Sequence, residues 1–315
     1  MTILVTGAGG FIGSHVADKL VQDGYNVVGL DNFSTGRNEN VTDFFANGGV
    51  IEVADIRDEK SLDEIFGEYK PERVIHLAAQ SAISTSWEDP KTDMEINARG
   101  TLNMLHACNR HGVKKFVLAS TSAVYREKDA PKVIRESWDR YPGSPYGASK
   151  LAAEVYTRQM FQDSIILRFG NVYGPRQVPV GGNQMIAIVM DYFTNPHSQY
   201  DFKVYGDGEQ TRDYIYVRDI VDIVIRSAFA DHERATFNAA TGKAKSVNYI
   251  LTQIEKLFGV VGYQWEHTKR QDPRRNVCMN IDYMKKRMNW KPHWSIKDGL
   301  KETAQWWLDR RNGYG

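Results

Sequence analysis

The sequence predicts an α/β fold in which a parallel β-sheet is doubly wound, with helices covering both of its faces. Short runs rich in Val and Ile alternate with longer helical patterns over the first half of the chain. These runs are apolar along their whole length, which indicates strands buried on both faces of a parallel sheet. A glycine-rich stretch follows the first run and opens the first helical pattern, the place where such folds bind ligands.

The predicted strands and helices alternate in order along the first half. Strands are expected at residues 3–7, 26–31, 50–55, 73–79, 115–120 and 164–170. Helices are expected between them at residues 11–24, 60–69, 95–112 and 146–161. Each helix would then form a right-handed crossover to the next parallel strand.

The alternation loosens after residue 170, which predicts a second, smaller domain. Residues 171–183 contain two Pro and three Gly and are typical of a loop, and short strands and helices follow. We predict that residues 1–170, joined by about 213–240, form a Rossmann-type domain. Residues 171–212 and 241–315 would form a smaller C-terminal domain that caps it and binds the substrate.

Composition excludes several classes of protein. Net charge is +1, from 40 basic and 39 acidic residues, so no strong field favours nucleic acid or an anionic membrane. Cys108 and Cys278 match no metal-ligand spacing and indicate free thiols, and the eight histidines include no HExxH-like pair, so no metal is expected. No apolar run approaches the roughly 18 residues needed to cross a bilayer. The strand pattern begins at residue 2, which leaves no room for a signal peptide, so we expect a cytoplasmic protein.

The stretch TGAGGFIG at residues 6–13 has the pattern of a dinucleotide-binding loop. Gly7, Gly10 and Gly13 are spaced as G-x-x-G-x-x-G between the first strand and the first helix. Glycine is needed where the turn is tight, where the backbone approaches a pyrophosphate, and where the helix packs on the strand. A glycine-rich turn without a ligand is the alternative, but the strand–loop–helix context favours a nucleotide.

Two aspartates at strand ends bear on which dinucleotide binds. Asp31 ends the second strand, about 20 residues after the loop, where a carboxylate accepts hydrogen bonds from the ribose hydroxyls. It would repel the extra phosphate of NADP, so NAD is the predicted cofactor. The alternative is an ordinary turn residue before NFSTG. Asp55 could accept from the adenine amino group, although by itself it is more typical of a turn or cap.

The stretch SPYGASK at residues 144–150 places a phenol and an ammonium four positions apart. Tyr146 and Lys150 would project from one face of a helix. A free phenol has a pKa of about 10, and a nearby ammonium favours the phenolate. A surface Tyr–Lys pair is the alternative, but Ser120, Thr121 and Ser122 place hydroxyls at the end of the preceding strand, at the ligand-binding edge of the sheet.

These motifs together resemble the extended short-chain dehydrogenase/reductase family, and within it the nucleotide-sugar epimerases of the UDP-glucose 4-epimerase type. The resemblance extends from residue 3 to about 220, and NWKP at 289–292 is similar to the family's tail. Besides the glycine loop, STSAVY and SPYGASK, the matching motifs are DNFSTG (31–36), DIRD (55–58), HLAAQ (76–80), NVYGPRQ (171–177) and GDGEQTRDYIYVRD (206–219).

The resemblance implies an NAD-dependent epimerase that passes through a transient 4-keto sugar. Tyr146 would be the base, Lys150 would hold the nicotinamide ribose, and Thr121 would bind the reacting sugar oxygen. The substrate is implied to be UDP-glucose and UDP-galactose or their N-acetyl forms, bound by Thr121, Asn171, Arg212 and Arg275. The implied cofactor-binding residues are Gly7, Gly10, Phe11, Ile12, Gly13, Asp31, Asn32, Ser34, Thr35, Gly36, Asp55, Ile56, Leu77, Ala78, Ala79, Gln80, Asn97, Tyr146, Lys150 and Phe169.

Several alternatives stay open within this resemblance. The substrate could be a CDP-, GDP- or dTDP-linked sugar, or the reaction could occur at another carbon. Related 4,6-dehydratases and decarboxylases carry carboxylates after the catalytic Thr, where this chain has Ser122 and Ala123. A non-catalytic NAD-binding sensor would need only the glycine loop and Asp31. His76 is interpreted as a satisfied strand-end residue and not as a base.

Two further features concern the substrate and the assembly. Arg212 could instead form an ion pair with Asp213 or Asp207. Arg275, or its neighbour Arg274, resembles the family's second phosphate-binding arginine. In the family a short segment that contains Gly follows this arginine, and part of that segment is missing here. A second departure is Arg126, which stands where the family usually has Gly. In relatives the helices matching residues 95–112 and 146–161 pair across a dimer, so a homodimer is implied by resemblance.

Overall fold

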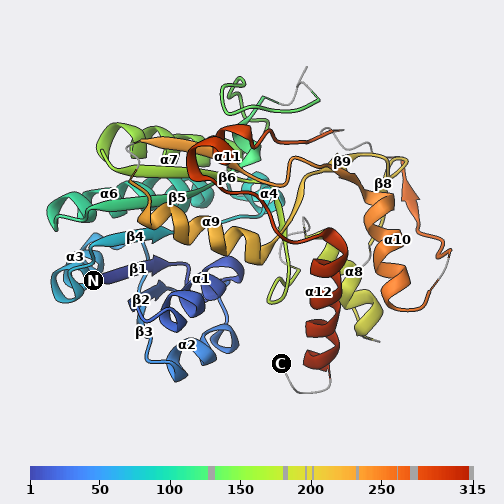
Figure 1. Cartoon of the computed structure of the whole chain (residues 1–315), viewed down its shortest axis with the longest axis horizontal. Helices are drawn as coiled ribbons and strands as arrows, with labels where there is room; N and C mark the ends of the chain where they lie inside the picture. Colours follow the sequence, from blue (N-terminus) through green and yellow to red (C-terminus); the bar gives the residue numbers. More distant parts are fainter. Residues whose placement is uncertain are drawn as a thin grey trace.

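The computed structural model describes residues 1–126, 132–179, 184–195, 197–200, 202–231, 234–260, 262–269 and 276–311. Seven parallel strands form one sheet in the order β11-β6-β5-β4-β1-β2-β3 (Figure 1). The strand order reverses between β1 and β4, so a ligand crevice opens at the carboxyl ends of these strands. The predicted doubly wound fold is therefore confirmed. The strands are β1 (Thr2–Thr6), β2 (Asn26–Asp31), β3 (Val50–Val53), β4 (Arg73–His76), β5 (Lys115–Thr121), β6 (Ser164–Phe169) and β11 (Ala235–Ala239).

Helices cover both faces of the sheet because successive strand residues point to opposite sides. Ile3 and Val5 enter one apolar core, while Leu4 between them enters the other. The first face packs against α1 (Phe11–Gln22) and α9 (Val217–Phe229), and the second against α3 (Glu59–Tyr69), α6 (Thr101–Arg110) and α7 (Pro145–Met160) (Figure 1).

Three predicted elements differ from those observed. The helix expected at 95–112 is the end of a longer helical segment that runs from Pro90 to Arg110, through α5 (Pro90–Met94), the π-helical turn η2 (Glu95–Gly100) and α6. The strand expected at 73–79 ends at His76, because the next two amides bond to the Thr6 hydroxyl. The strand expected at 50–55 ends at Val53, where the chain enters a turn.

The segment after β6 contains a strand where a loop was predicted. β7 (Asn171–Tyr173) pairs in parallel with β10 (Tyr214–Tyr216). These two strands lie on opposite sides of the predicted domain boundary, whereas β11 and α9 belong with the large sheet as predicted. The division into two domains stays a prediction.

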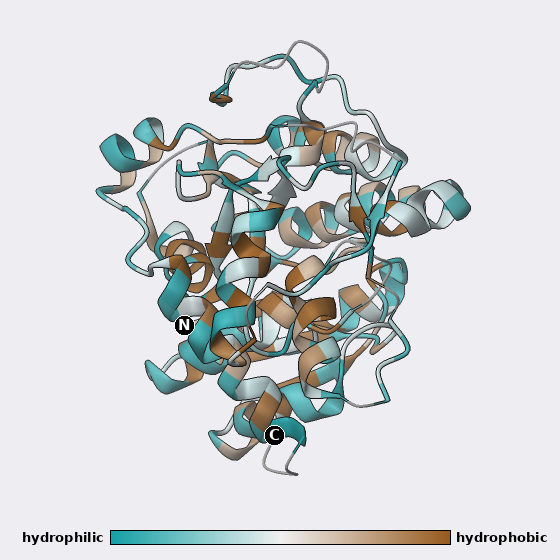
Figure 2. Cartoon of the chain, turned by 90° about the vertical axis from the view of Figure 1, so that its right-hand side faces the viewer, coloured by the Kyte–Doolittle hydropathy of each residue, from teal (hydrophilic) through white to brown (hydrophobic). Residues whose placement is uncertain are grey.

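Three further helices gather beside the sheet. α8 (Met185–Thr194), α10 (Val247–Leu257) and α12 (Ile296–Arg311) pack on one another through apolar side chains of the first core (Figure 1). Figure 2, which views the molecule from this side, shows apolar residues toward the middle of the chain and hydrophilic residues prominent at its margins. The other elements are η1 (Asn38–Val41), α2 (Thr42–Ala46), α4 (Ile83–Glu88), η3 (Ser122–Val124), β8 (Val204–Tyr205), β9 (Thr211–Arg212), β12 (Lys245–Ser246), β13 (His267–Thr268) and α11 (Asp282–Met288).

The described residues include neither a membrane-spanning helix nor a cluster of metal ligands. None of the helices described has both the length and the apolar character of a membrane span. In the same part of the chain, no group of three or more His, Cys, Asp or Glu side chains is arranged to hold a metal ion.

Candidate active site

The glycine loop leaves no room for side chains. Gly7 has a φ of +73°, and a Cβ on it would lie 2.8 Å from the Ala78 amide nitrogen. A Cβ on Gly13 would overlap the Gly7 carbonyl. Helix α1 begins after Gly10, and within the described part of the chain no side chain caps it. Its first-turn amides are therefore left to bind an anion such as a pyrophosphate.

Asp31 ends β2 beside this loop, where two backbone amides hold its carboxylate. Oδ2 accepts from the Gly9 amide at 2.8 Å, and Oδ1 accepts from the Phe33 amide at 2.8 Å. Burial raises the pKa of this carboxyl, and the two hydrogen bonds oppose the rise. A Cβ on Gly36 would come within 2.8 Å of Oδ1. The segment after β2 therefore packs closely over the glycine loop and fixes Asp31 at the edge of the sheet.

The structure gathers the predicted cofactor residues along the carboxyl edge of the sheet. Those that end β1 to β6, or follow these strands within two positions, are Gly7, Asp31, Asn32, Asp55, Leu77, Ala78 and Phe169, and the predicted catalytic residue Thr121 ends β5 at the same edge. Asp55 accepts hydrogen bonds from the Arg57 guanidinium at 2.7 and 2.9 Å and from the Asn32 amide at 2.8 Å. The Arg57 bond is the main cause that lowers the pKa of Asp55 to about 2. These contacts support the interpretation of Asp55 as a turn residue.

Tyr146 lies in the first turn of α7, which packs against the turn that follows β5. The Ser144 hydroxyl caps the helix by accepting from the Gly147 amide at 3.2 Å. Glycine at position 147 lets α7 pack closely against this turn, because a Cβ there would overlap the Ala123 carbonyl. Thr121 begins this turn, and its Oγ1 accepts from the Ala123 amide at 3.1 Å. That bond leaves the Thr121 hydroxyl proton for another acceptor.

Lys150 follows Tyr146 by one helical turn and is 2% exposed. Burial lowers its pKa from 10.5 to about 8, while the carboxylates of Glu154 and Asp93 oppose the shift. The ammonium therefore persists at neutral pH. It supplies a buried positive charge on the face of α7 that carries Tyr146.

We predict that a Lys150→Met variant is more stable than the wild type at pH 7, by about 1–3 kcal/mol, because it removes a desolvated charge. The folded-state pKa of Lys150 lies below its unfolded value, so the unfolded chain binds more protons between about pH 8 and 10.5. The wild type therefore regains stability relative to the variant as pH rises through that window. Urea unfolding of the NAD-free proteins at pH 7 and pH 10 measures both effects. A variant that is less stable at pH 7 would contradict the prediction.

Asp93 and Ser149 form a buried network beneath the site that the sequence did not reveal. The Ser149 hydroxyl donates to Asp93 Oδ2 at 2.5 Å. The side-chain amides of Gln80 and Asn97 donate to Asp93 Oδ1 at 2.7 and 3.1 Å. Both amides are thus bound within the protein, and they hold the carboxylate that interacts with Lys150. Asn97 lies in the π-helical turn η2, a local distortion that is frequent at functional sites.

His76 is a structural residue, in agreement with the sequence interpretation. It is 1% exposed, with Nδ1 at 2.7 Å from Thr6 Oγ1 and Nε2 at 3.1 Å from Thr101 Oγ1. The Thr101 hydroxyl donates to the Asn97 carbonyl at 2.6 Å, so Nε2 donates to Thr101 and Nδ1 accepts from Thr6. Burial, aided by the charge of Lys150, lowers the pKa of His76 to about 3. The ring is therefore neutral and fully bonded.

Two of the predicted substrate residues, Asn171 and Arg212, lie on short strands beyond β6. Asn171 begins β7, and its amide donates to the Asp213 carbonyl at 2.7 Å. Arg212 ends β9, and its Nη1 donates to the Thr211 carbonyl at 2.8 Å. Arg275 and its neighbour Arg274 lie outside the described residues. Their roles stay predictions.

The Asp213 carboxylate accepts its hydrogen bonds from Thr241, Gly242 and Met279, and the ion pair of Arg212 with Asp213 or Asp207 stays an alternative. The carboxylate accepts from the Thr241 amide at 2.8 Å and the Thr241 hydroxyl at 2.6 Å. It also accepts from the amides of Gly242 and Met279 at 3.0 and 3.2 Å. Asp213 therefore connects the residues just after β11 to the segment near residue 279.

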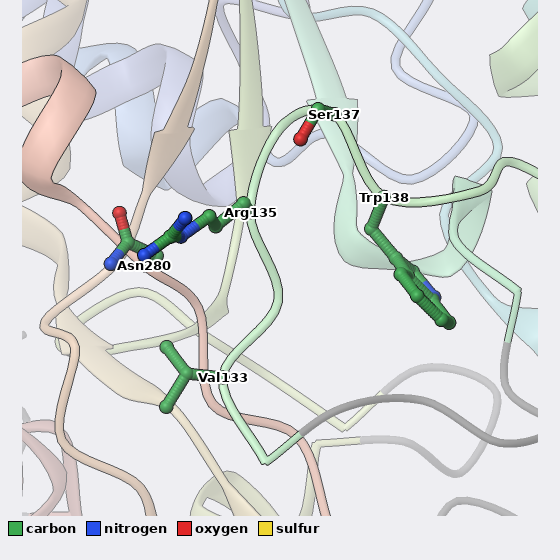
Figure 3. Close-up of a pocket in the computed structure, with 5 residues that line it drawn as sticks. All are labelled: Val133, Arg135, Ser137, Trp138 and Asn280. Atoms are coloured by element: carbon green, nitrogen blue, oxygen red, sulfur yellow. The ribbon is translucent and has the colours of Figure 1, made fainter.

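A cavity of about 500 Å³ is lined by residues of the segments near 135 and 280 (Figure 3). Arg135 extends toward Asn280 on one side of it, and Trp138 lies on the other. Its lining contains none of the predicted catalytic or cofactor residues, so we do not assign the reaction to it. The lining residues described are Val133, Arg135, Ser137, Trp138 and Asn280.

The fold and these residues define an NAD-dependent enzyme. The glycine cradle, the uncapped start of α1 and the carboxylate of Asp31 fit a dinucleotide without a ribose phosphate. The family model described as the NAD dependent epimerase/dehydratase family matches residues 3–240. The chain belongs to this family, and NAD is its cofactor.

Relatives and solved structures match nearly the full length. A putative UDP-glucose 4-epimerase of Methanocaldococcus jannaschii is 37% identical, covering 96% of this chain and 97% of the relative. The UDP-glucose 4-epimerase of Thermotoga maritima, solved with UDP-glucose, has a TM-score of 0.90 at 33% identity and covers 98% of this chain and 99% of that one. The Thermus thermophilus UDP-glucose 4-epimerase in complex with NAD has a TM-score of 0.87 at 33% identity, with coverages of 98% and 99%.

Other reactions occur among the relatives. A dTDP-glucose 4,6-dehydratase of Neisseria gonorrhoeae is 31% identical, covering 98% of this chain and 96% of the relative. The epimerases among these relatives and structures identify the chain as an NAD-dependent epimerase of the UDP-glucose 4-epimerase type.

Proposed function

We propose that this protein is a nucleotide-sugar 4-epimerase that interconverts UDP-glucose and UDP-galactose, or their N-acetyl forms, through a transient 4-keto sugar. The observation that carries the proposal is the packing of the start of α7, with Tyr146 and the buried Lys150, against the turn at Thr121. Thr121 ends β5 at the carboxyl edge of the sheet, two strands away from β1 and the glycine loop that follows it.

The roles follow from the chemistry of each group. Tyr146 takes and returns the proton of the sugar 4-hydroxyl, and the Lys150 ammonium favours its phenolate form. Thr121 keeps a hydroxyl proton with which to bind the sugar O4. Bound NAD supplies the acceptor and donor of the C4 hydride, so no external oxidant is consumed. Asn171 is proposed to contact the sugar nucleotide, and Arg212 and Arg275 are proposed to bind its diphosphate, because guanidinium groups suit phosphate oxygens.

The dehydratase alternative is less favoured, because Ser122 and Ala123 stand where those relatives carry acids. The Ala123 side chain is buried and carries no proton donor. Substrates linked to CDP, GDP or dTDP remain the second candidate. Reaction at another carbon is a variant of the same candidate.

The test is to purify the protein, identify the released cofactor and incubate the protein with a panel of nucleotide sugars without added NAD. Formation of the 4-epimer from a UDP-hexose supports the proposal. Isomers formed only from other nucleotide sugars would replace the proposed substrate. Bound NAD without turnover on any sugar would contradict the proposed reaction and favour a sensor.

We also propose that the protein is a cytoplasmic homodimer, with a second copy covering an apolar face on α4, α5 and α7. Trp87, Met94, Val155 and Tyr156 are 63%, 49%, 50% and 41% exposed on these adjacent helices. Exposed apolar groups of this size are typical of interfaces. The described thiols of Cys108 and Cys278 are free, as suits a reducing compartment.

We predict that Val155→Asp combined with Tyr156→Asp converts a dimer into a monomer, because charges at the centre of an apolar interface are desolvated without partners. Sedimentation equilibrium of both proteins gives the mass. Phe45→Asp is the matched control, since Phe45 is 53% exposed on α2. A wild type that is monomeric at high concentration would overturn the proposed dimer.

A further inference from the structure

A buried ion pair joins α7 to β6, two helical turns beyond Tyr146. Arg168 in β6 and Glu154 in α7 have side chains that are 0% and 1% exposed. The guanidinium is bidentate, with Nε at 2.8 Å from Oε1 and Nη2 at 2.6 Å from Oε2. Arg168 Nη1 also donates to the Tyr125 hydroxyl at 2.9 Å and to the Glu136 carbonyl at 3.0 Å. Both charges are therefore fully satisfied inside the protein.

The position of Glu154 connects it to both parts of the proposed catalytic group. Tyr146, Lys150 and Glu154 are spaced by four residues and so share one face of α7. The Ser120 hydroxyl, from the residue just before Thr121, donates to Glu154 Oε1 at 2.6 Å. The Glu154 carboxylate thus contacts β5 next to Thr121, and Glu154 lies one helical turn beyond Lys150.

Stability alone is a weak reason for such a pair. When two charges are buried, the free energy of their mutual attraction only partly offsets the free energy of hydration that they lose. Apolar residues of similar volume often give the protein equal stability. The Tyr125 hydroxyl continues the network to Asn238 Oδ1 at 2.6 Å. The pair therefore links α7 with β5, β6 and β11 at the edge where the reaction is proposed.

We propose that Glu154, held by Arg168, is a positioning residue for the proposed epimerase: it fixes the Ser120–Thr121 end of β5 against α7 and places a carboxylate one turn from Lys150 on the face that carries Tyr146. This inference rests on the proposed function for its kinetic consequences. The ionisation of Tyr146 provides a consequence that can be measured without turnover.

The charges around Lys150 agree with this role. Tyr146 and Glu154 lie on its own helix, Asp93 approaches from α5, and the neutral ring of His76 approaches from β4. Burial lowers the pKa of Lys150 to about 8, and Glu154 is the first of the two carboxylates that oppose this. Without the Glu154 charge the pKa of Lys150 falls further. Tyr146 then loses the positive neighbour that favours its phenolate, so the pKa of Tyr146 rises.

The test uses the NAD-bound protein with Glu154→Gln combined with Arg168→Met, which leaves no unpaired buried charge and preserves an acceptor for Ser120. We expect kcat to fall at least tenfold, with KM changed less than threefold. In the plot of kcat against pH, the apparent pKa on the acidic side should rise by about one unit. Tyrosinate absorbance, taken as the difference between each protein and its Tyr146→Phe form, should shift in the same direction.

Two further variants separate the parts of the proposal. Ser120→Ala removes only the bond to β5, and we expect a loss in kcat with an unchanged apparent pKa on the acidic side. Lys115→Met with Asp163→Asn removes an ion pair at the opposite end of β5, whose lysine is 1% exposed, and should leave both readouts unchanged.

Wild-type kcat and an unshifted Tyr146 titration in the Glu154/Arg168 double variant would overturn the proposal. An unchanged kcat in Ser120→Ala would overturn the positioning of β5, even if the double variant failed to fold. A wild type that epimerises no sugar would instead contradict the proposed function. The absorbance titration would still test the effect of Glu154 on Tyr146.

Discussion

A Tyr146→Phe variant is expected to lose roughly 10²–10⁴-fold in kcat while it keeps the fold and bound NAD, because the substitution removes only the group that transfers the proton. The ring remains to pack in the first turn of α7, and Lys150 remains buried behind it. KM for the nucleotide sugar should change little, since the phenol acts on a hydroxyl at the reacting carbon. Steady-state kinetics on the sugar found active in the substrate panel, with the released NAD quantified, measures the effect.

The matched control is Tyr141→Phe, five residues earlier in the chain. Tyr141 is 74% exposed, so loss of its hydroxyl should leave kcat, bound NAD and stability unchanged. A Tyr146→Phe variant with wild-type kcat would remove Tyr146 from the proposed chemistry. A variant that loses NAD or unfolds earlier would assign the tyrosine a structural role instead.

A Gly13→Ala variant is expected to lose most of its bound NAD and about 1–3 kcal/mol of stability. The added methyl group overlaps the Gly7 carbonyl, which belongs to the backbone and cannot rotate away. Helix α1 must then move off β1, and its first-turn amides move with it. NAD content after purification and urea unfolding of the NAD-free protein report the two effects separately, because bound ligand itself stabilises the folded state.

Gly67→Ala is the control for adding a methyl group at a glycine within a helix. Gly67 lies in α3, and a Cβ there would meet only the His111 ring at 3.8 Å. Alanine lowers the entropy of the unfolded chain and favours the helix, so this variant should be as stable as the wild type or up to about 1 kcal/mol more stable. Equal NAD content in Gly13→Ala and Gly67→Ala would contradict the role assigned to the loop.

The arrangement of the large sheet followed from local patterns. Apolar runs from residue 3 to residue 170 predicted six of its seven strands, because strands buried on both faces leave a continuous apolar signal. β7 was missed because three residues among Pro and Gly carry no periodicity. The π-helical turn at Glu95–Gly100 was also missed, since a local change of hydrogen-bond register leaves no mark in apolar spacing.

The supporting residues of the site were harder to find than its motifs. Arg168 is the single charge inside the apolar run SIILRFG, and a charge in a buried strand predicts a buried partner of opposite charge. Glu154 is the residue four positions after Lys150, yet its spacing alone does not distinguish a buried acid from a solvated one. Asp93 lies far from α7 in sequence, and only the folded chain places it beside Ser149 and Lys150.

The sequence by itself determined the doubly wound sheet, the glycine loop and the spacing of Tyr146 and Lys150, because these depend on neighbouring residues and on apolar periodicity. Only the tertiary structure decided that Lys150 is desolvated, that His76 is neutral and that the Asp213 carboxylate binds Thr241, Gly242 and Met279. Charge, burial and hydrogen bonding depend on contacts between residues far apart in the chain. These contacts exist only once the strands and helices have packed.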